Sequence, residues 1–85
     1  MRLKVRKIGK GLHPSEVVVE VTTSTGKERL VVDKRSLEEN SLLVGSPIAE
    51  GGDSLLVELP REAMSGAWRV WVKRNLLFEG KARAA

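Results

Sequence analysis

The chain has 85 residues, a formal net charge of +4 and no cysteine. This length allows one domain with one small core, which leaves little room for a deep catalytic cavity. The lack of cysteine excludes disulfides, thiolate metal sites and cysteine nucleophiles. A domain this small without disulfides is typical of a reducing compartment, and no apolar run of signal-peptide or membrane-span length is present, so we expect a cytoplasmic protein without membrane contact.

Charge is distributed along the chain in three blocks. Residues 1–10 contain five basic and no acidic side chains, residues 11–67 contain five basic and ten acidic ones, and residues 68–85 contain five basic and one acidic. Cationic ends around an anionic middle either form a surface for nucleic acid or neutralise each other when strands pair. The pairing of the strands therefore decides how much free cationic surface remains.

The first two predicted strands are residues 1–6 and 16–21, where apolar and polar residues alternate. Glycine and proline in the intervening segment predict a loop. If the strands pair antiparallel with residue numbers that sum to 22, apolar side chains face each other inside and Arg2 faces Glu20 outside. Opposite charges across a strand pair stabilise that register, so the sequence predicts this hairpin.

The next segments predict further short strands. Residues 22–27 predict a turn and residues 28–32 a strand with its alternate apolar residues inward. The segment Ser36–Glu39 matches a capping box, which leaves either a short helical turn or a plain connecting loop. Residues 41–48 predict another strand, interrupted at 45–47 by glycine, serine and proline.

The second half of the chain predicts one more strand, a short helix and a tail. Residues 51–53 indicate a turn and residues 54–59 a strand. Proline at position 60 and glycine at position 66 are typical of the start and the end of a helix, so residues 60–66 predict one. Residues 79–85 are short, polar or small and predict a disordered tail.

These elements predict a mainly β fold, with residues 1–78 as a single β domain. Five to six short strands with one or two short helical turns are typical of a small antiparallel barrel or roll. The sequence shows no internal repeat and no segment of low complexity.

The last predicted strand, residues 68–73, contains both tryptophans of the chain. On a strand, Trp68 points to the core, whereas Trp71 points outward between Arg69 and Lys73. A large aromatic between two cations predicts a contact site. The alternative is structural: the ring lies over a neighbouring strand or turn while its basic neighbours extend to solvent.

Two functions fit this pattern, and the first is favoured. One is a non-enzymatic interaction module that binds an unknown protein or a second copy of itself, as an adaptor or small subunit does. The other is a small β-barrel that binds nucleic acid by stacking and phosphate contacts. One outward aromatic and a partly neutralised amino-terminal block weaken the second. The candidate contact surface is Arg69, Trp71, Lys73, Arg74, Lys7 and Lys10.

Side chains for catalysis are scarce. His13 is the only histidine, and it lies in a loop of glycine and proline without a predicted carboxylate partner. The segment Gly9–Gly11 lacks the remaining residues of a phosphate loop, and no serine lies in a nucleophile elbow. We therefore expect no enzymatic activity, no cofactor, no metal and no small-molecule substrate.

Overall fold

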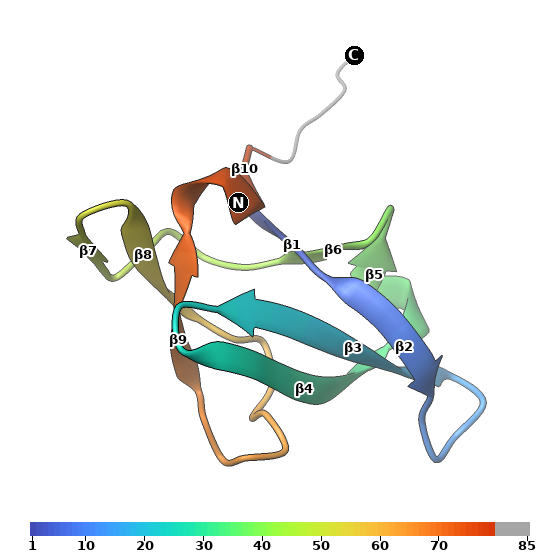
Figure 1. The fold of residues 1–85 in the computed structure, drawn as a ribbon. Coiled ribbons are helices and arrows are strands. Elements are labelled where there is room, and N and C mark those ends of the chain that lie inside the picture. Colours follow the sequence, from blue (N-terminus) through green and yellow to red (C-terminus); the bar gives the residue numbers. More distant parts are fainter. Residues whose placement is uncertain (80–85) are drawn as a thin grey trace.

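The computed structural model describes residues 1–79, and their regular structure is almost entirely β (Figure 1). No helix in this part of the chain is long and apolar enough to cross a bilayer. The predicted tail falls outside the described residues except for Glu79. The elements are β1 (Arg2–Lys4), β2 (Arg6–Lys10), β3 (Glu16–Thr23), β4 (Gly26–Asp33), the 3-10 turn η1 (Lys34–Ser36), β5 (Leu37–Glu38), β6 (Ser41–Leu43), β7 (Ala49–Gly51), β8 (Ser54–Glu58), β9 (Arg69–Lys73), the 3-10 turn η2 (Arg74–Leu76) and β10 (Leu77–Phe78).

The strands form three antiparallel sheets, with the orders β10-β1-β6-β5, β2-β3-β4 and β7-β8-β9. The expected mainly β, antiparallel class is confirmed. The expected five to six strands are wrong: the chain leaves one sheet for another within the predicted strand 1–6, and the short strands β5, β7 and β10 lie outside the predicted ones. Among the described strands the ladders stay in three separate sheets, and they do not close into one barrel.

One apolar cluster contains side chains from all three sheets. Alternation along each strand turns these side chains inward, where burial of a leucine or valine contributes about 1.5–3 kcal/mol each. Each sheet therefore covers the apolar face of the others. The members with no exposed surface are Leu3, Val19, Val21, Leu30, Leu42, Val57 and Val72.

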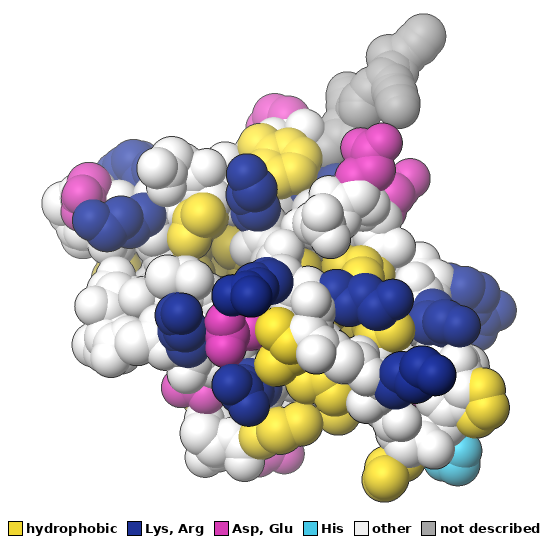
Figure 2. All heavy atoms as spheres, turned by 45° about the vertical axis from the view of Figure 1, so that its right-hand side comes forward, with side chains coloured by type: hydrophobic (Ala, Val, Ile, Leu, Met, Phe, Trp, Pro, Cys, Tyr) yellow, Lys and Arg dark blue, Asp and Glu magenta, His cyan; other side chains and the backbone are white. Residues whose placement is uncertain are grey.

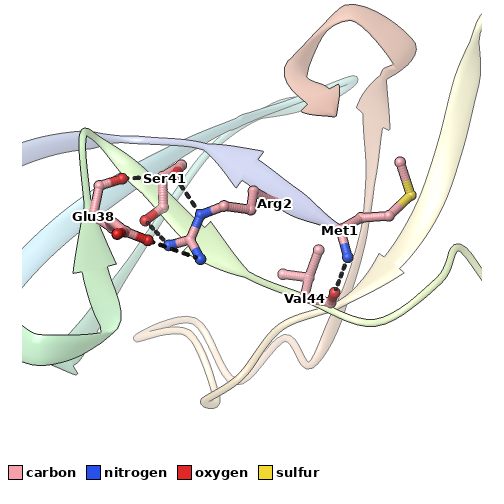
Figure 3. Close-up of polar contacts among 5 residues, drawn as sticks. All are labelled: Met1, Arg2, Glu38, Ser41 and Val44. Atoms are coloured by element: carbon pink, nitrogen blue, oxygen red, sulfur yellow. Dashed lines mark hydrogen bonds and ion pairs between the residues drawn. The ribbon is translucent and has the colours of Figure 1, made fainter. Parts of the chain in front are cut away.

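The amino-terminal strand pairs differently from the prediction. β1 pairs with β6 and β10, and only β2 pairs with β3, where Arg6 rather than Arg2 lies opposite Glu20. The predicted register is therefore wrong. Arg2 instead donates from Nε to Ser41 Oγ at 2.7 Å and from Nη2 to the Ser41 carbonyl at 2.9 Å, and its Nη1 lies 3.5 Å from Glu38 Oε1 (Figure 3).

The predicted helix at residues 60–66 is also wrong. The segment is an irregular loop, anchored by the buried Ala63 and by a hydrogen bond from Met64 N to the Arg29 carbonyl of β4 at 2.7 Å. Gly66 has φ +95°, a left-handed conformation that glycine adopts without strain. The glycine that resembled a helix terminator therefore serves a loop.

The helical turn expected at Ser36–Glu39 lies one turn earlier. Asp33 is its cap, and one of its carboxylate oxygens accepts a hydrogen bond from Arg35 N at 2.8 Å. Ser36 is the last residue of the turn, and Leu37–Glu38 forms β5. The predicted strand 41–48 is likewise shorter, because pairing ends at Leu43.

The order of elements repeats along the chain. The series β1-β2-β3-β4-η1-β5 is followed by β6-β7-β8-β9-η2-β10, and each series contains a three-stranded sheet of the same order. β1 and β6 pair with each other, while each half contributes its last short strand to the other half: β10 pairs with β1, and β5 pairs with β6. The two halves are thus related by an approximate twofold axis that passes between β1 and β6.

Long-range backbone hydrogen bonds occur in matching pairs that follow this axis. The sequence shows this relation only faintly, between Val32–Leu37 and Val72–Leu77, which share the valine and the leucine at their ends. The pairs are Val5 N to Asn40 O (2.8 Å) with Val44 N to Met1 O (2.7 Å), and Lys34 N to Ser15 O (2.7 Å) with Arg74 N to Asp53 O (3.0 Å).

Candidate functional site

The outer face of β7-β8-β9 carries the aromatic residue predicted as a contact site. Along β9, Val70 and Val72 are buried, whereas Arg69, Trp71 and Lys73 are exposed. The predicted alternation is confirmed within this strand. We call the outer side of the sheet, centred on Trp71, the Trp71 face.

Trp71 is partly covered by its own sheet. It lies opposite Leu56 of β8, and its ring reaches β7, where ring carbon Cζ3 lies 3.3 Å from the position that a Cβ would occupy at Gly51. Glycine at this position lets the indole approach the backbone closely. The ring nevertheless remains 39% exposed, so packing over neighbouring strands leaves an aromatic surface open to solvent.

Every basic candidate next to Trp71 has an acidic partner. Exposed pairs of this kind stabilise a fold by about 0–1 kcal/mol each, but they also cancel the positive potential of the face. The three pairs are Arg69 Nε with Glu58 Oε2 at 3.9 Å, Lys73 Nζ with Asp53 Oδ2 at 4.0 Å, and Arg74 Nη2 with Glu50 Oε2 at 2.9 Å.

Arg74 is the most firmly held of the three. Its Nη2 also donates to the Gly52 carbonyl at 3.1 Å, and its Nε donates to the same oxygen at 3.4 Å. The guanidinium thus joins the β7-β8 turn to Glu50 on β7. These donors are occupied within the protein, so Arg74 contributes to the fold rather than to a free cationic patch.

Lys7 and Lys10 lie on β2, in a different sheet from Trp71. The structure therefore divides the predicted contact surface into two parts. Both lysines line a pocket of about 430 Å³, which we call the lysine pocket. Its other walls are Lys34 of η1, Glu16 and Val17 of β3, and the loop that contains His13.

Figure 2 shows the basic side chains of this part of the surface, with few acidic ones among them toward the right-hand side. Among the described residues, no carboxylate lies within 4.0 Å of the side-chain nitrogens of the basic residues of β2 or of Lys34. Glu20, which faces Arg6 across the strands, pairs with Lys27 and Arg29. The uncompensated positive charge is thus concentrated around β2 and the lysine pocket.

Trp68 is a surface residue that the sequence placed in the core. It is 50% exposed and lines a hollow of about 380 Å³ with Met64 and Pro60. The predicted core position of Trp68 is therefore wrong. Because β9 begins only at Arg69, Trp68 lies at the end of the sheet, beyond the apolar cluster. Alternation alone does not reveal where a sheet ends.

The described residues offer little for catalysis or metal binding. His13 is exposed, and its backbone N–H, not its ring, donates to Glu16 Oε1 at 3.3 Å. Within residues 1–79, no three acidic or histidine side chains are grouped so that they would hold a metal ion. Among the carboxyls of the described residues, Asp33 has a perturbed pKa, which is lowered first by the side-chain hydrogen bond from Arg35 and then by the backbone N–H of Arg35.

Comparisons of the chain with protein-family models, with curated proteins and with solved structures found no match. The Trp71 face and the lysine pocket are therefore the basis for any functional conclusion.

Proposed function

We propose that this protein is a small non-enzymatic binding module that contacts a partner protein through the Trp71 face. The observation that supports this most is the half-exposed indole surrounded by basic side chains that each have a carboxylate partner. An aromatic centre with a polar rim is typical of protein interfaces, in which tryptophan often contributes 2 kcal/mol or more.

The same charges disfavour nucleic acid at this face. A phosphate backbone is bound mainly through uncompensated lysine and arginine, which displace counterions. At the Trp71 face a phosphate would have to displace Glu58, Asp53 or Glu50 from its partner. A partner protein can contact this face without displacing the carboxylates from their basic partners.

In this proposal residues 1–78 act as one cytoplasmic domain, in which the three sheets curl around their shared core as a roll. The approximate twofold relation supports this, because each half completes its own pairing with a strand of the other half. Neither half provides all its own strand partners.

The proposal is tested by replacing Trp71 with a photo-crosslinking amino acid in the native host. A matched variant carries the same group at Thr22, an exposed position in the β2-β3-β4 sheet. We expect a defined adduct from position 71 and none from position 22. The captured protein, once purified, should bind the unmodified chain and lose affinity about tenfold or more on Trp71→Ala, which corresponds to about 1.4 kcal/mol.

Sedimentation of the purified chain shows whether the captured partner is a second copy. The same adducts from both positions, or full affinity after Trp71→Ala, would contradict the proposal.

A second candidate function is nucleic-acid binding through the β1 and β2 strands. Lys4, Arg6, Lys7 and Lys10 have no carboxylate partner among the described residues, and they follow one continuous stretch of chain. Binding to a duplex that weakens steeply with salt, and weakens further on Arg6→Gln, supports it. Binding with no salt dependence counts against it.

A further inference from the structure

The twofold relation allows the lysine pocket to be compared with its counterpart in the other half. In the β2-β3 pair Lys10 lies opposite Val17, and in the β7-β8 pair Glu50 lies opposite Leu55. Val17 and Leu55 are both buried. Each lies opposite the valine that comes two residues before the 3-10 turn of its half, so the two occupy equivalent places. Lys10 and Glu50 are therefore equivalent positions.

Lys34 and Arg74 are equivalent as well. Each begins its 3-10 turn, and each donates its backbone N–H to the residue that precedes the middle strand of its own half. In the second half Arg74 meets the carboxylate of Glu50 at 2.9 Å. In the first half Lys34 lines the same pocket as Lys10, so a second cation stands where the other half has a carboxylate.

The first half also has space beside these lysines. Its β2-β3 loop is longer than the β7-β8 turn, and the loop forms one wall of the pocket of about 430 Å³. That volume lies within the range of about 300–1,000 Å³ that is usual for small-ligand sites. The first half thus has an open pocket beside Lys10 and Lys34, where the second half has an ion pair between Glu50 and Arg74.

The charge of the pocket indicates what fills it. Lys7, Lys10 and Lys34 are three cations, and Glu16 is the one carboxylate on the wall, which leaves a net charge of +2 with His13 neutral. Glu16 Oε1 is already held by His13 N at 3.3 Å. Lysine ammonium groups bind phosphate as compact point charges.

We propose that the lysine pocket binds a phosphate group or an oxyanion of the same charge, about −2, which acts as the counterion that Glu50 provides in the other half. The proposal does not depend on a protein contact at the Trp71 face, because it concerns a different sheet and a different ligand. Together with Glu16 the anion neutralises the three lysines, as Glu50 neutralises Arg74.

Titration of the full chain with inorganic phosphate at low ionic strength tests this, followed by NMR of the amides of Gly9 and Gly11. The decisive variant is Lys10→Glu, which gives the first half the carboxylate that the second half already accommodates, so we expect it to fold. The control is Lys27→Gln, since Lys27 is ion-paired with Glu20 outside the pocket. We expect saturable binding at one site, weakened about tenfold or more by Lys10→Glu and about twofold or less by Lys27→Gln.

A second arm uses a nucleoside 5′-monophosphate in place of inorganic phosphate. Tighter binding with the same dependence on Lys10 assigns the phosphate to a larger ligand, and equal binding assigns it to the free anion; both support the site. No saturation up to about 10 mM phosphate, or equal weakening by Lys10→Glu and Lys27→Gln, would overturn it.

Discussion

Ion pairing at individual residues separates the basic side chains into two classes. Arg74 has a carboxylate at 2.9 Å and a carbonyl at 3.1 Å, whereas Lys10 has no acidic partner among the described residues. Lys10 is equivalent to Glu50, the carboxylate that holds Arg74, so a change of charge sign at one position separates a paired cation from an unpaired one. Net charge alone therefore says little about which surface is free to bind.

Part of this residue-level picture is visible in the sequence. Alternation placed Trp71 outward and Val72 inward, and both placements are confirmed. The partners of Arg69 and Lys73 were not predicted, because they come from β8 and the β7-β8 turn, which become neighbours only once the sheet forms. Trp68 was misplaced because the end of a sheet leaves no mark on alternation.

The carboxyl of Asp33 gives a pH-dependent prediction. Its pKa in the folded protein lies below its ordinary value of 3.8, chiefly because the Arg35 side chain donates to it. A lowered folded pKa means that the stabilisation is fully present above the unfolded pKa and is lost as the pH falls through the folded one. Asp33→Asn should thus reduce the free energy of unfolding at neutral pH, with the difference shrinking below about pH 4.

Denaturant unfolding across this pH range provides the measurement for Asp33→Asn. The control is Asp53→Asn, which removes the same charge from a residue that caps no 3-10 turn. A deficit that stays constant down to acidic pH would contradict the role assigned to the Asp33 carboxylate.

Strands in this protein are short because the chain repeatedly passes from one sheet to the next. Val5 separates β1 from β2, and a buried residue at such a bend belongs to the shared core. Local turn chemistry was sufficient for the β3-β4 hairpin, whose Leu30 and Val32 are buried as predicted. It was not sufficient for β1, since alternation identifies a strand without identifying its partner.

The central position of β6 leads to a prediction from two adjacent leucines. Leu42 is fully buried opposite Leu3, whereas Leu43 is 64% exposed. Leu42→Ala should lower the free energy of unfolding by about 2–5 kcal/mol because it leaves a cavity where β1 and β6 meet. Leu43→Ala should change it by about 0.5 kcal/mol or less.

Chemical denaturation of the two leucine variants makes the comparison directly. Similar losses for both would mean that β6 does not present one face to the core and the other to solvent. That outcome would remove the pairing on which the twofold relation depends.

The whole molecule is a pair of similar halves whose differences carry the proposed functions. The fold of each half is retained by matching backbone hydrogen bonds. The second half has the aromatic face with balanced charges, and the first half has the open pocket with unbalanced ones. The sequence did not reveal this arrangement, because side-chain similarity between the halves is limited to a few residues around each 3-10 turn.

A circular permutant tests the equivalence of the halves. β5 and β6 pair antiparallel and are joined by a turn at Glu39-Asn40, with φ of +51° and +61°. β10 and β1 also pair antiparallel, but no turn of the chain joins them. Joining Glu79 to Met1 through a short glycine-rich linker in place of residues 80–85, and opening the chain between Glu39 and Asn40, should preserve the fold. Surface turns commonly tolerate such exchanges.

Cooperative thermal unfolding and an amide NMR spectrum close to that of the parent chain are the expected results for the permutant. A permutant that fails to fold would show that the two connections are not equivalent.

The ion pairs around Trp71 should leave this face unsuited to phosphate. Fluorescence of the Trp68→Phe variant reports on Trp71 alone, and a short single-stranded oligonucleotide at about 50 mM salt is the probe. We expect that Trp71 emission does not change, even if the oligonucleotide binds near β2. Quenching of Trp71 that weakens steeply with salt and disappears on Arg69→Ala would contradict it.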